Sequence, residues 1–144
     1  MTVAWVTPKT NWYGYTTPAG TYSGDYFTYV DFNRIKNNLD ELKTIAEASY
    51  TYITIPWNAL GNDRVVNDLV SIDDMNAIEE NLDNLNSASV SLDIGSVRFT
   101  ENTALTFQEL NRIESACLKL KDEIANAAAG RRKFTWNFGK GIEI

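Results

Sequence analysis

Three stretches of the chain share one pattern of apolar and polar positions. "TYVDFNRIKNNLDEL" begins at Thr28, "SIDDMNAIEENLDNL" at Ser71 and "TFQELNRIESACLKL" at Thr106. Apolar residues recur in steps of three and four, which places them on one face of an α-helix. The stripes are Phe32, Ile35, Leu39 and Leu42; Met75, Ile78, Leu82 and Leu85; and Leu110, Ile113, Cys117 and Leu120. Each stretch therefore predicts an amphipathic helix that buries one stripe.

Two N-terminal signals coincide at the start of each predicted helix. The expected caps Thr28, Ser71 and Thr106 are followed three residues later by Asp31, Asp74 and Glu109, as in a capping box. The residues before the caps are Phe27, Val70 and Leu105, which are placed to form a hydrophobic staple with the fourth helical residue. We expect helices near 28–46, 71–87 and 106–129, the last ending at Gly130.

An asparagine follows the fourth helical residue every time, at Asn33, Asn76 and Asn111. Asparagine is a mediocre helix former, so its recurrence suggests that the amide bonds the backbone of a neighbouring segment, for instance the segment leading into the helix. A polar ligand contact is the alternative, although one structural device used three times explains the pattern better than three ligand sites. The intervals of 43 and 35 residues indicate duplication within one domain.

Several short segments alternate between apolar and polar residues and predict strands. They are "YITI" before Pro56, "VSLDI", "SVRFT" and "KFTWNF". Together with the helices they predict a small α+β protein, a single domain over 1–144 with a C-terminal strand at 132–138. The basic run 131–133 suits the negative end of the third helix, and a nucleic-acid patch is its alternative.

The N-terminal segment, 1–27, is rich in aromatic residues and is broken by glycine and proline. Turn residues are too dense here for a long helix, so an ordered loop is expected. Its aromatic side chains could pack on the protein's own core, face a partner protein or stack on a sugar. The candidate partner-binding residues are Trp12, Tyr13, Tyr15 and Tyr22, with Trp136 from the predicted C-terminal strand.

Composition narrows the expected chemistry. The 144 residues carry a net charge of −6, which argues against nucleic acid or an anionic membrane as partner. With no histidine and one cysteine, neither a metal site of the usual type nor a histidine general base is expected. No cofactor is expected either. Neither a secretory signal nor a membrane span is evident, so synthesis in a cytoplasm is expected.

Other motifs do not predict a catalytic or metal site. Asp73 with Asp74, and Glu79 with Glu80, are adjacent on a helix and point in different directions, whereas a glycosidase needs two facing carboxylates. "DRVVNDLVSIDD" lacks the glycine and glutamate of a calcium loop. Cys117 occupies a stripe position, which favours a buried apolar role.

A family resemblance adds an expected function. "WVTPKTNW" followed by "DYFTYVDFNRIKNNLDEL" resembles the opening of many tail, baseplate and fibre-anchoring structural proteins of bacteriophages and prophages of Gram-positive bacteria. The similarity covers residues 5–45 and is echoed at 67–86 and 102–121. It implies a non-catalytic virion protein that assembles with other tail proteins. Since tails have rotational symmetry, it also implies several copies around the tail axis.

Two functions of other classes stay open. A carbohydrate-binding or host-adhesion module would use the N-terminal aromatics to stack on a host surface glycan. A glycan hydrolase would need a concave pair of carboxylates, for which the sequence offers no compelling candidate.

Overall fold

The computed structural model describes residues 5–50, 53–103 and 105–143, with side chains described as far as residue 127. The elements are β1 Gly14–Thr16, β2 Tyr22–Gly24, α1 Tyr29–Ser49, α2 Ile72–Ala88 and α3 Phe107–Glu143. The strands pair antiparallel, with Gly14 opposite Gly24 and Tyr15 opposite Ser23. The predicted α+β class is thus confirmed.

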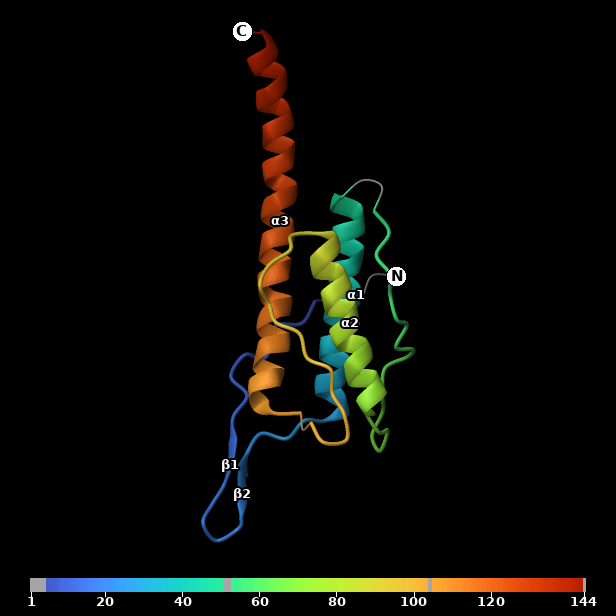
Figure 1. Ribbon diagram of the computed structural model, residues 1–144, viewed down its shortest axis with the longest axis vertical. Helices are drawn as coiled ribbons and strands as arrows, with labels where there is room; N and C mark the ends of the chain where they lie inside the picture. Colours follow the sequence, from blue (N-terminus) through green and yellow to red (C-terminus); the bar gives the residue numbers. More distant parts are fainter. Residues whose placement is uncertain (1–4, 51–52, 104, 144) are drawn as a thin grey trace.

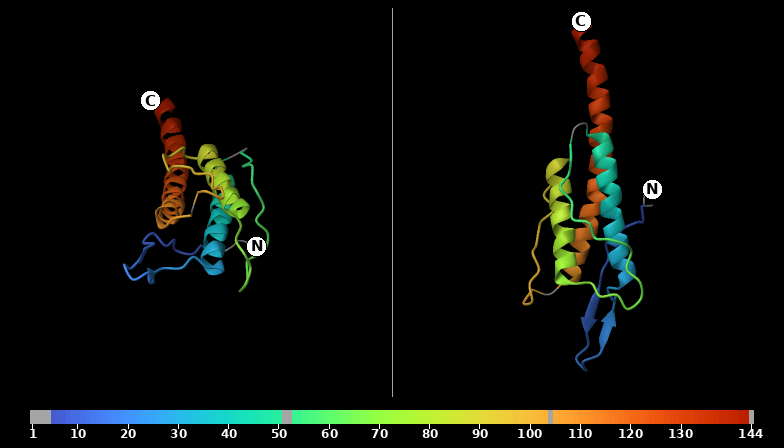
Figure 2. Two further views of the ribbon diagram at one scale, coloured as in Figure 1. Left: turned by 60° about the horizontal axis from the view of Figure 1, so that its bottom comes forward. Right: turned by 90° about the vertical axis from the view of Figure 1, so that its right-hand side faces the viewer.

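All three helices run in the same direction. In Figure 1 each helix begins at the lower end of the bundle, where the β-hairpin lies, and continues upward. Because consecutive helices are parallel, each connection must return along the length of the bundle, and the two connections do so as extended chain on its surface (Figure 2). α3 extends beyond the ends of α1 and α2.

The predicted stripes form the core. All twelve stripe residues are buried, and Ala46 and Ile124 extend two of the stripes by one more step of four. Apolar spacing of three and four in parallel helices is the pattern of a coiled coil, in which each buried residue packs between residues of its neighbours. Burying one such leucine or isoleucine contributes about 1.5–3 kcal/mol.

Each helix begins one residue after its predicted cap. Ser71 and Asp74 form a reciprocal capping box, with each backbone N–H bonded to the other's side chain at 3.0 and 3.1 Å. The carboxylate of Asp31 accepts from the Thr28 N–H at 2.9 Å, and the Thr106 hydroxyl accepts from the Glu109 N–H at 3.2 Å. These bonds satisfy N–H groups that would otherwise lack partners.

The predicted strands were wrong. Residues 132–138 belong to α3, which does not end at Gly130 but continues to Glu143. Residues 53–55, 90–94 and 96–100 lie outside regular strands. A strand needs a partner for its backbone hydrogen bonds, whereas a helix supplies its own and extended chain can use side chains. The observed strands instead lie in the N-terminal segment, where the sequence predicted only a loop.

Candidate functional site

The three repeated asparagines each hold one residue of an extended segment by both its backbone groups. Asn33 bonds the N–H and C=O of Arg64 at 2.7 and 2.8 Å. Asn76 bonds those of Phe99 at 2.7 and 3.0 Å, and Asn111 bonds those of Trp12 at 2.7 and 3.1 Å. The predicted backbone role is confirmed. Each segment, however, leads into the next helix around the bundle, not into the helix that holds it.

A second set of asparagines, five residues later, holds the start of these segments. Asn38 bonds the N–H and C=O of Val6 at 3.0 and 2.7 Å. Asn81 bonds those of Asn58 at 2.7 and 3.0 Å. Each held pair, Val6 with Trp12 and Asn58 with Arg64, is six residues apart. The sequence analysis missed this set, although its spacing from Asn33 and Asn76 repeats.

These contacts define one structural unit that occurs three times. A unit is an extended segment followed by a helix. The first two segments are 6–12 and 58–64, and the third ends at Phe99 and begins at residue 93 by the same spacing of six. The end of every segment is bonded by the preceding helix in cyclic order, so that α3 precedes α1. The chain therefore folds with approximate threefold repetition, and the places where the units differ identify features that the scaffold does not require.

One difference is a missing asparagine in the third unit. The position equivalent to Asn38 and Asn81 is Ala116, and the equivalent backbone position is Asp93. Both residues line a cavity of about 110 Å³. The cavity therefore lies where an asparagine at position 116 would place its amide.

We expect Ala116→Asn to stabilise the protein by about 0.5–1.5 kcal/mol, because the new amide would bond the Asp93 backbone. Urea unfolding would measure the gain. Ala116→Leu adds similar bulk without an amide and serves as the control. An Ala116→Asn variant no more stable than this control would contradict the proposed equivalence of the three units.

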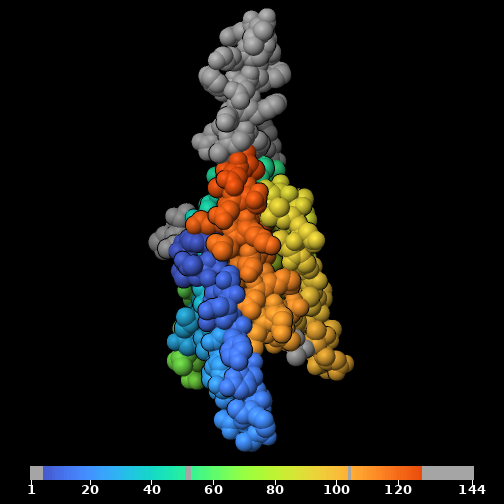
Figure 3. Space-filling model, turned by 90° about the vertical axis from the view of Figure 1, so that its left-hand side faces the viewer, coloured from blue at the N-terminus to red at the C-terminus, as the bar shows by residue number. Residues whose placement is uncertain are grey.

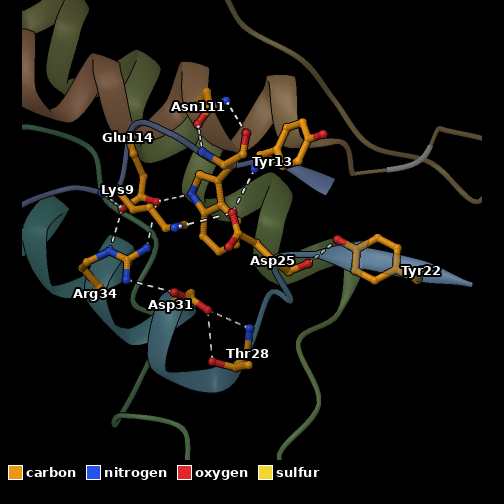
Figure 4. A network of polar contacts seen from close by, with 10 residues as sticks. Lys9, Tyr13, Tyr22, Asp25, Thr28, Asp31, Arg34, Asn111 and Glu114 are labelled. Carbon is orange, nitrogen blue, oxygen red and sulfur yellow. Dashed lines mark hydrogen bonds and ion pairs between the residues drawn. The ribbon is translucent and has the colours of Figure 1, made fainter. Parts of the chain in front are cut away.

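A buried charge network joins the N-terminal segment to two helices (Figure 4). Glu114 of α3 is 1% exposed and accepts from Arg34 Nε at 2.7 Å and from Arg34 Nη2 at 2.8 Å. Its carboxylate also accepts from the Trp12 indole at 2.6 Å and the Lys9 N–H at 3.0 Å. The bond to Glu114 raises the pKa of the Arg34 guanidinium. Glu114 therefore holds α1, α3 and the N-terminal segment together.

The equivalent positions in the other units are also buried and charged. Glu79 of α2 pairs with Arg112 of α3, and burial raises the pKa of Glu79 although Arg112 opposes the shift. In α1 the residue is Lys36, which donates to the Gly61 carbonyl at 3.2 Å and lowers the pKa of Asp63. Each of these buried charges bonds a residue of a neighbouring element. Their positions are therefore accounted for by the packing of the fold, without a ligand.

Trp12 was a candidate partner-binding residue, but the structure places its side chain in the core and not on the surface. Its side chain is 4% exposed and stacks on Phe107 with ring centroids 6.1 Å apart. The sequence left three environments open for the N-terminal aromatics, and Trp12 takes the first, packing on the protein's own core. Its indole N–H donates to Glu114 while its ring packs against apolar neighbours. This combination suits a side chain with an apolar body and one polar group.

The β-hairpin is an insertion in the first unit. Trp12 is followed by the cap Thr28 after 16 positions, but Arg64 and Phe99 precede their caps by 7. The first connection is therefore nine residues longer. A Cβ atom on Gly14 would clash with the Phe107 ring, and one on Gly24 would clash with the Gly14 Cα. The hairpin base thus requires glycine on both strands.

The hairpin projects away from the bundle (Figure 3), and several aromatic side chains in and beside it are exposed. Tyr13 and Tyr15 are 62% and 48% exposed, with ring centroids 5.7 Å apart. Tyr26 is 70% exposed, and half-buried Tyr22 donates its hydroxyl to the Asp25 carbonyl. The candidate partner-binding residues named from the sequence did not include Tyr26, although it belongs to the same aromatic stretch. The Trp136 side chain lies outside the described residues, and its backbone is helical.

Neither a metal centre nor a membrane span is found in the described part of the chain. No group of three or more histidine, cysteine or acidic residues is placed to hold an ion there. No described helix combines the length and apolarity needed to cross a bilayer. No family model matches the chain, and no curated protein or solved structure is significantly similar to it.

Proposed function

We propose that this protein is a non-catalytic structural or adaptor component of a bacteriophage tail or baseplate. In this proposal the hairpin contacts another tail protein, and several copies surround the tail axis in the virion. The sequence resemblance to phage tail proteins supports the particle assignment. The inserted hairpin is the observation that supports the contact surface.

The argument for the hairpin rests on comparison within the molecule. Two of the three units connect their held residue to the helix cap in seven positions, so the scaffold can be completed without a hairpin. The additional residues instead form a hairpin on which Tyr15 is exposed, next to the exposed Tyr13. Tyrosine is enriched at protein interfaces because its ring contributes apolar contact while its hydroxyl bonds at the polar rim.

Deleting residues 15–23 provides a direct test. The deletion joins Gly14 to Gly24, which are already paired, and leaves the seven-position connection of the other units. We expect the shortened chain to fold with nearly unchanged stability but to lose incorporation into phage particles. Thermal unfolding and immunoblotting of purified particles would measure the two properties. Normal incorporation of a folded deletion variant would reject the hairpin as the assembly surface.

Cross-linking within intact particles tests the assignment independently. We expect residues 13–26 to cross-link to another polypeptide chain, identified by mass spectrometry. Exposed Lys119 on α3 offers a comparison point away from the hairpin. A protein absent from purified particles would contradict the virion proposal, whereas its presence with an uncross-linked hairpin would contradict only the surface.

Carbohydrate binding is the second candidate function, because two tyrosine rings stand exposed side by side. Tyr13 and Tyr15 are tilted by 55° to each other and could contact the faces of a glycan. The relevant variants are Tyr13→Ala and Tyr15→Ala, because these two rings are exposed whereas Trp12 is buried. Glycan-array binding that is lost in either variant would favour adhesion over assembly.

A further inference from the structure

A second exposed apolar surface lies at the end of the bundle where the hairpin lies. The fold does not require its residues to be apolar. Three residues between the second segment and α2 are strongly exposed: Val65 at 60%, Val66 at 65% and Leu69 at 88%. Ile72, in the first turn of α2, is 40% exposed. We refer to residues 65–69 as the apolar loop.

The third unit provides an internal control for this loop. In the third unit Phe99 precedes the cap Thr106 by seven positions, just as Arg64 precedes its own cap in the second unit. There the residues equivalent to Val65 and Val66 are Thr100 and Glu101, both exposed and polar. The turn can therefore be made with polar residues, and the exposed valines require another explanation.

An apolar pocket lies beside the loop. Its volume is about 160 Å³, enough for one leucine- or phenylalanine-sized group. Apolar lining comes from Phe27, Val70, Ile72, Met75, Phe99 and Leu105. Phe27, Val70 and Leu105 are the residues that precede the three helix caps, so the pocket lies where the three units converge.

Exposed acidic residues adjoin this apolar area in the sequence. Asp68 and Asp73 are exposed on either side of Val70, and Glu101 is exposed in the adjoining connection that also contributes Thr103 to the pocket. None of the ion pairs formed within the described residues involves these three carboxylates. The nearest cations in sequence, Arg64 and Arg98, are already paired with Asp74 and Asp83. The charge around the pocket is therefore unbalanced and negative.

We propose that the apolar loop and pocket bind a partner polypeptide segment that inserts one large apolar side chain flanked by lysine or arginine. The apolar side chain enters the pocket beside Met75 and contacts Leu69. The flanking cations lie against Asp73 and Glu101, because charge complementarity directs the partner's orientation. This site uses different residues from the hairpin and does not depend on the virion proposal.

Capped tripeptides supply a defined probe for the intact chain. NMR spectra would follow the methyl groups of Val70, Ile72 and Met75 during titration with acetyl-Lys-Phe-Lys-amide. We expect saturable shifts at millimolar peptide. Acetyl-Glu-Phe-Glu-amide should bind more weakly, and acetyl-Lys-Ser-Lys-amide should cause no saturable shift at these methyl groups.

Variants separate the apolar contribution from the charge contribution. Leu69→Ala and Thr103→Trp, which fills the pocket from its exposed edge, should abolish the shifts, whereas Leu118→Ala on exposed α3 surface should not. Asp73→Asn with Glu101→Gln should weaken binding about two- to fivefold. Circular dichroism would verify that each variant is folded.

Three results would overturn the proposal. The first is the absence of saturable shifts with the lysine–phenylalanine peptide, and the second is unchanged binding by folded Leu69→Ala and Thr103→Trp. The third is a concentration-dependent shift of the same methyl groups without peptide, which would assign the surface to a second copy of the chain.

Discussion

Glu114→Ala is expected to destabilise the protein by about 3–5 kcal/mol, the loss typical of removing one partner from a buried ion pair. Glu114 is almost fully buried and accepts hydrogen bonds from Arg34, Trp12 and the Lys9 backbone. Without the carboxylate, the largely buried Arg34 guanidinium would keep only its bond to Asp31. The Trp12 indole N–H and the Lys9 backbone N–H would lose their acceptor. Urea unfolding followed by circular dichroism would measure the change.

Glu123→Ala is the matched control for this experiment. It makes the same substitution in the same helix, but at an exposed position, so we expect a change within about 0.5 kcal/mol. If Glu114→Ala cost no more than this control, Glu114 would not be holding the N-terminal segment against α1 and α3. Faster proteolysis near Lys9 in the Glu114 variant would locate the released segment.

Asn111→Ala is expected to destabilise the protein by about 2–6 kcal/mol. The substitution removes both bonds to the Trp12 backbone and leaves a partly buried N–H and C=O unpaired, at about 1–3 kcal/mol each. Amide hydrogen exchange of Trp12 should accelerate in the variant because its N–H would no longer be bonded. Chemical denaturation would give the total change in free energy.

Asn126→Ala tests whether the effect belongs to the asparagine position. Asn126 is exposed in the same helix, and alanine is the better helix former, so its replacement should be neutral or slightly stabilising. The equivalent variants Asn33→Ala and Asn76→Ala should resemble Asn111→Ala. Losses confined to one of the three would mean that the units are not energetically equivalent.

Local sequence signals determined where each helix begins and what it buries. A cap such as Ser71 with Asp74 satisfies N–H groups within four residues, so its information lies in adjacent positions. The apolar stripes likewise follow from helical periodicity alone. The asparagines were correctly assigned to backbone bonding, because an amide within a helix can satisfy both groups of an extended chain.

The strand predictions failed because alternation by itself does not provide a partner. Residues 90–94 and 96–100 have the period of strands, but their backbones are held by asparagine side chains, as Leu92 is by Asn86 and Phe99 by Asn76. Residues 132–138 continue α3 instead. In the N-terminal segment, the facing glycines Gly14 and Gly24 allow the close approach on which the hairpin depends.

Only the tertiary structure decided which aromatic residues are buried and which chain segments meet. Trp12 and Tyr13 are neighbours in a uniformly aromatic stretch, yet one lies in the core and the other is exposed. The difference depends on Asn111 and Glu114, which are distant from both residues in sequence. The sequence by itself determined the helices because their caps and stripes are local. The threefold arrangement, the inserted hairpin and the apolar pocket required the structure because they depend on contacts between distant segments.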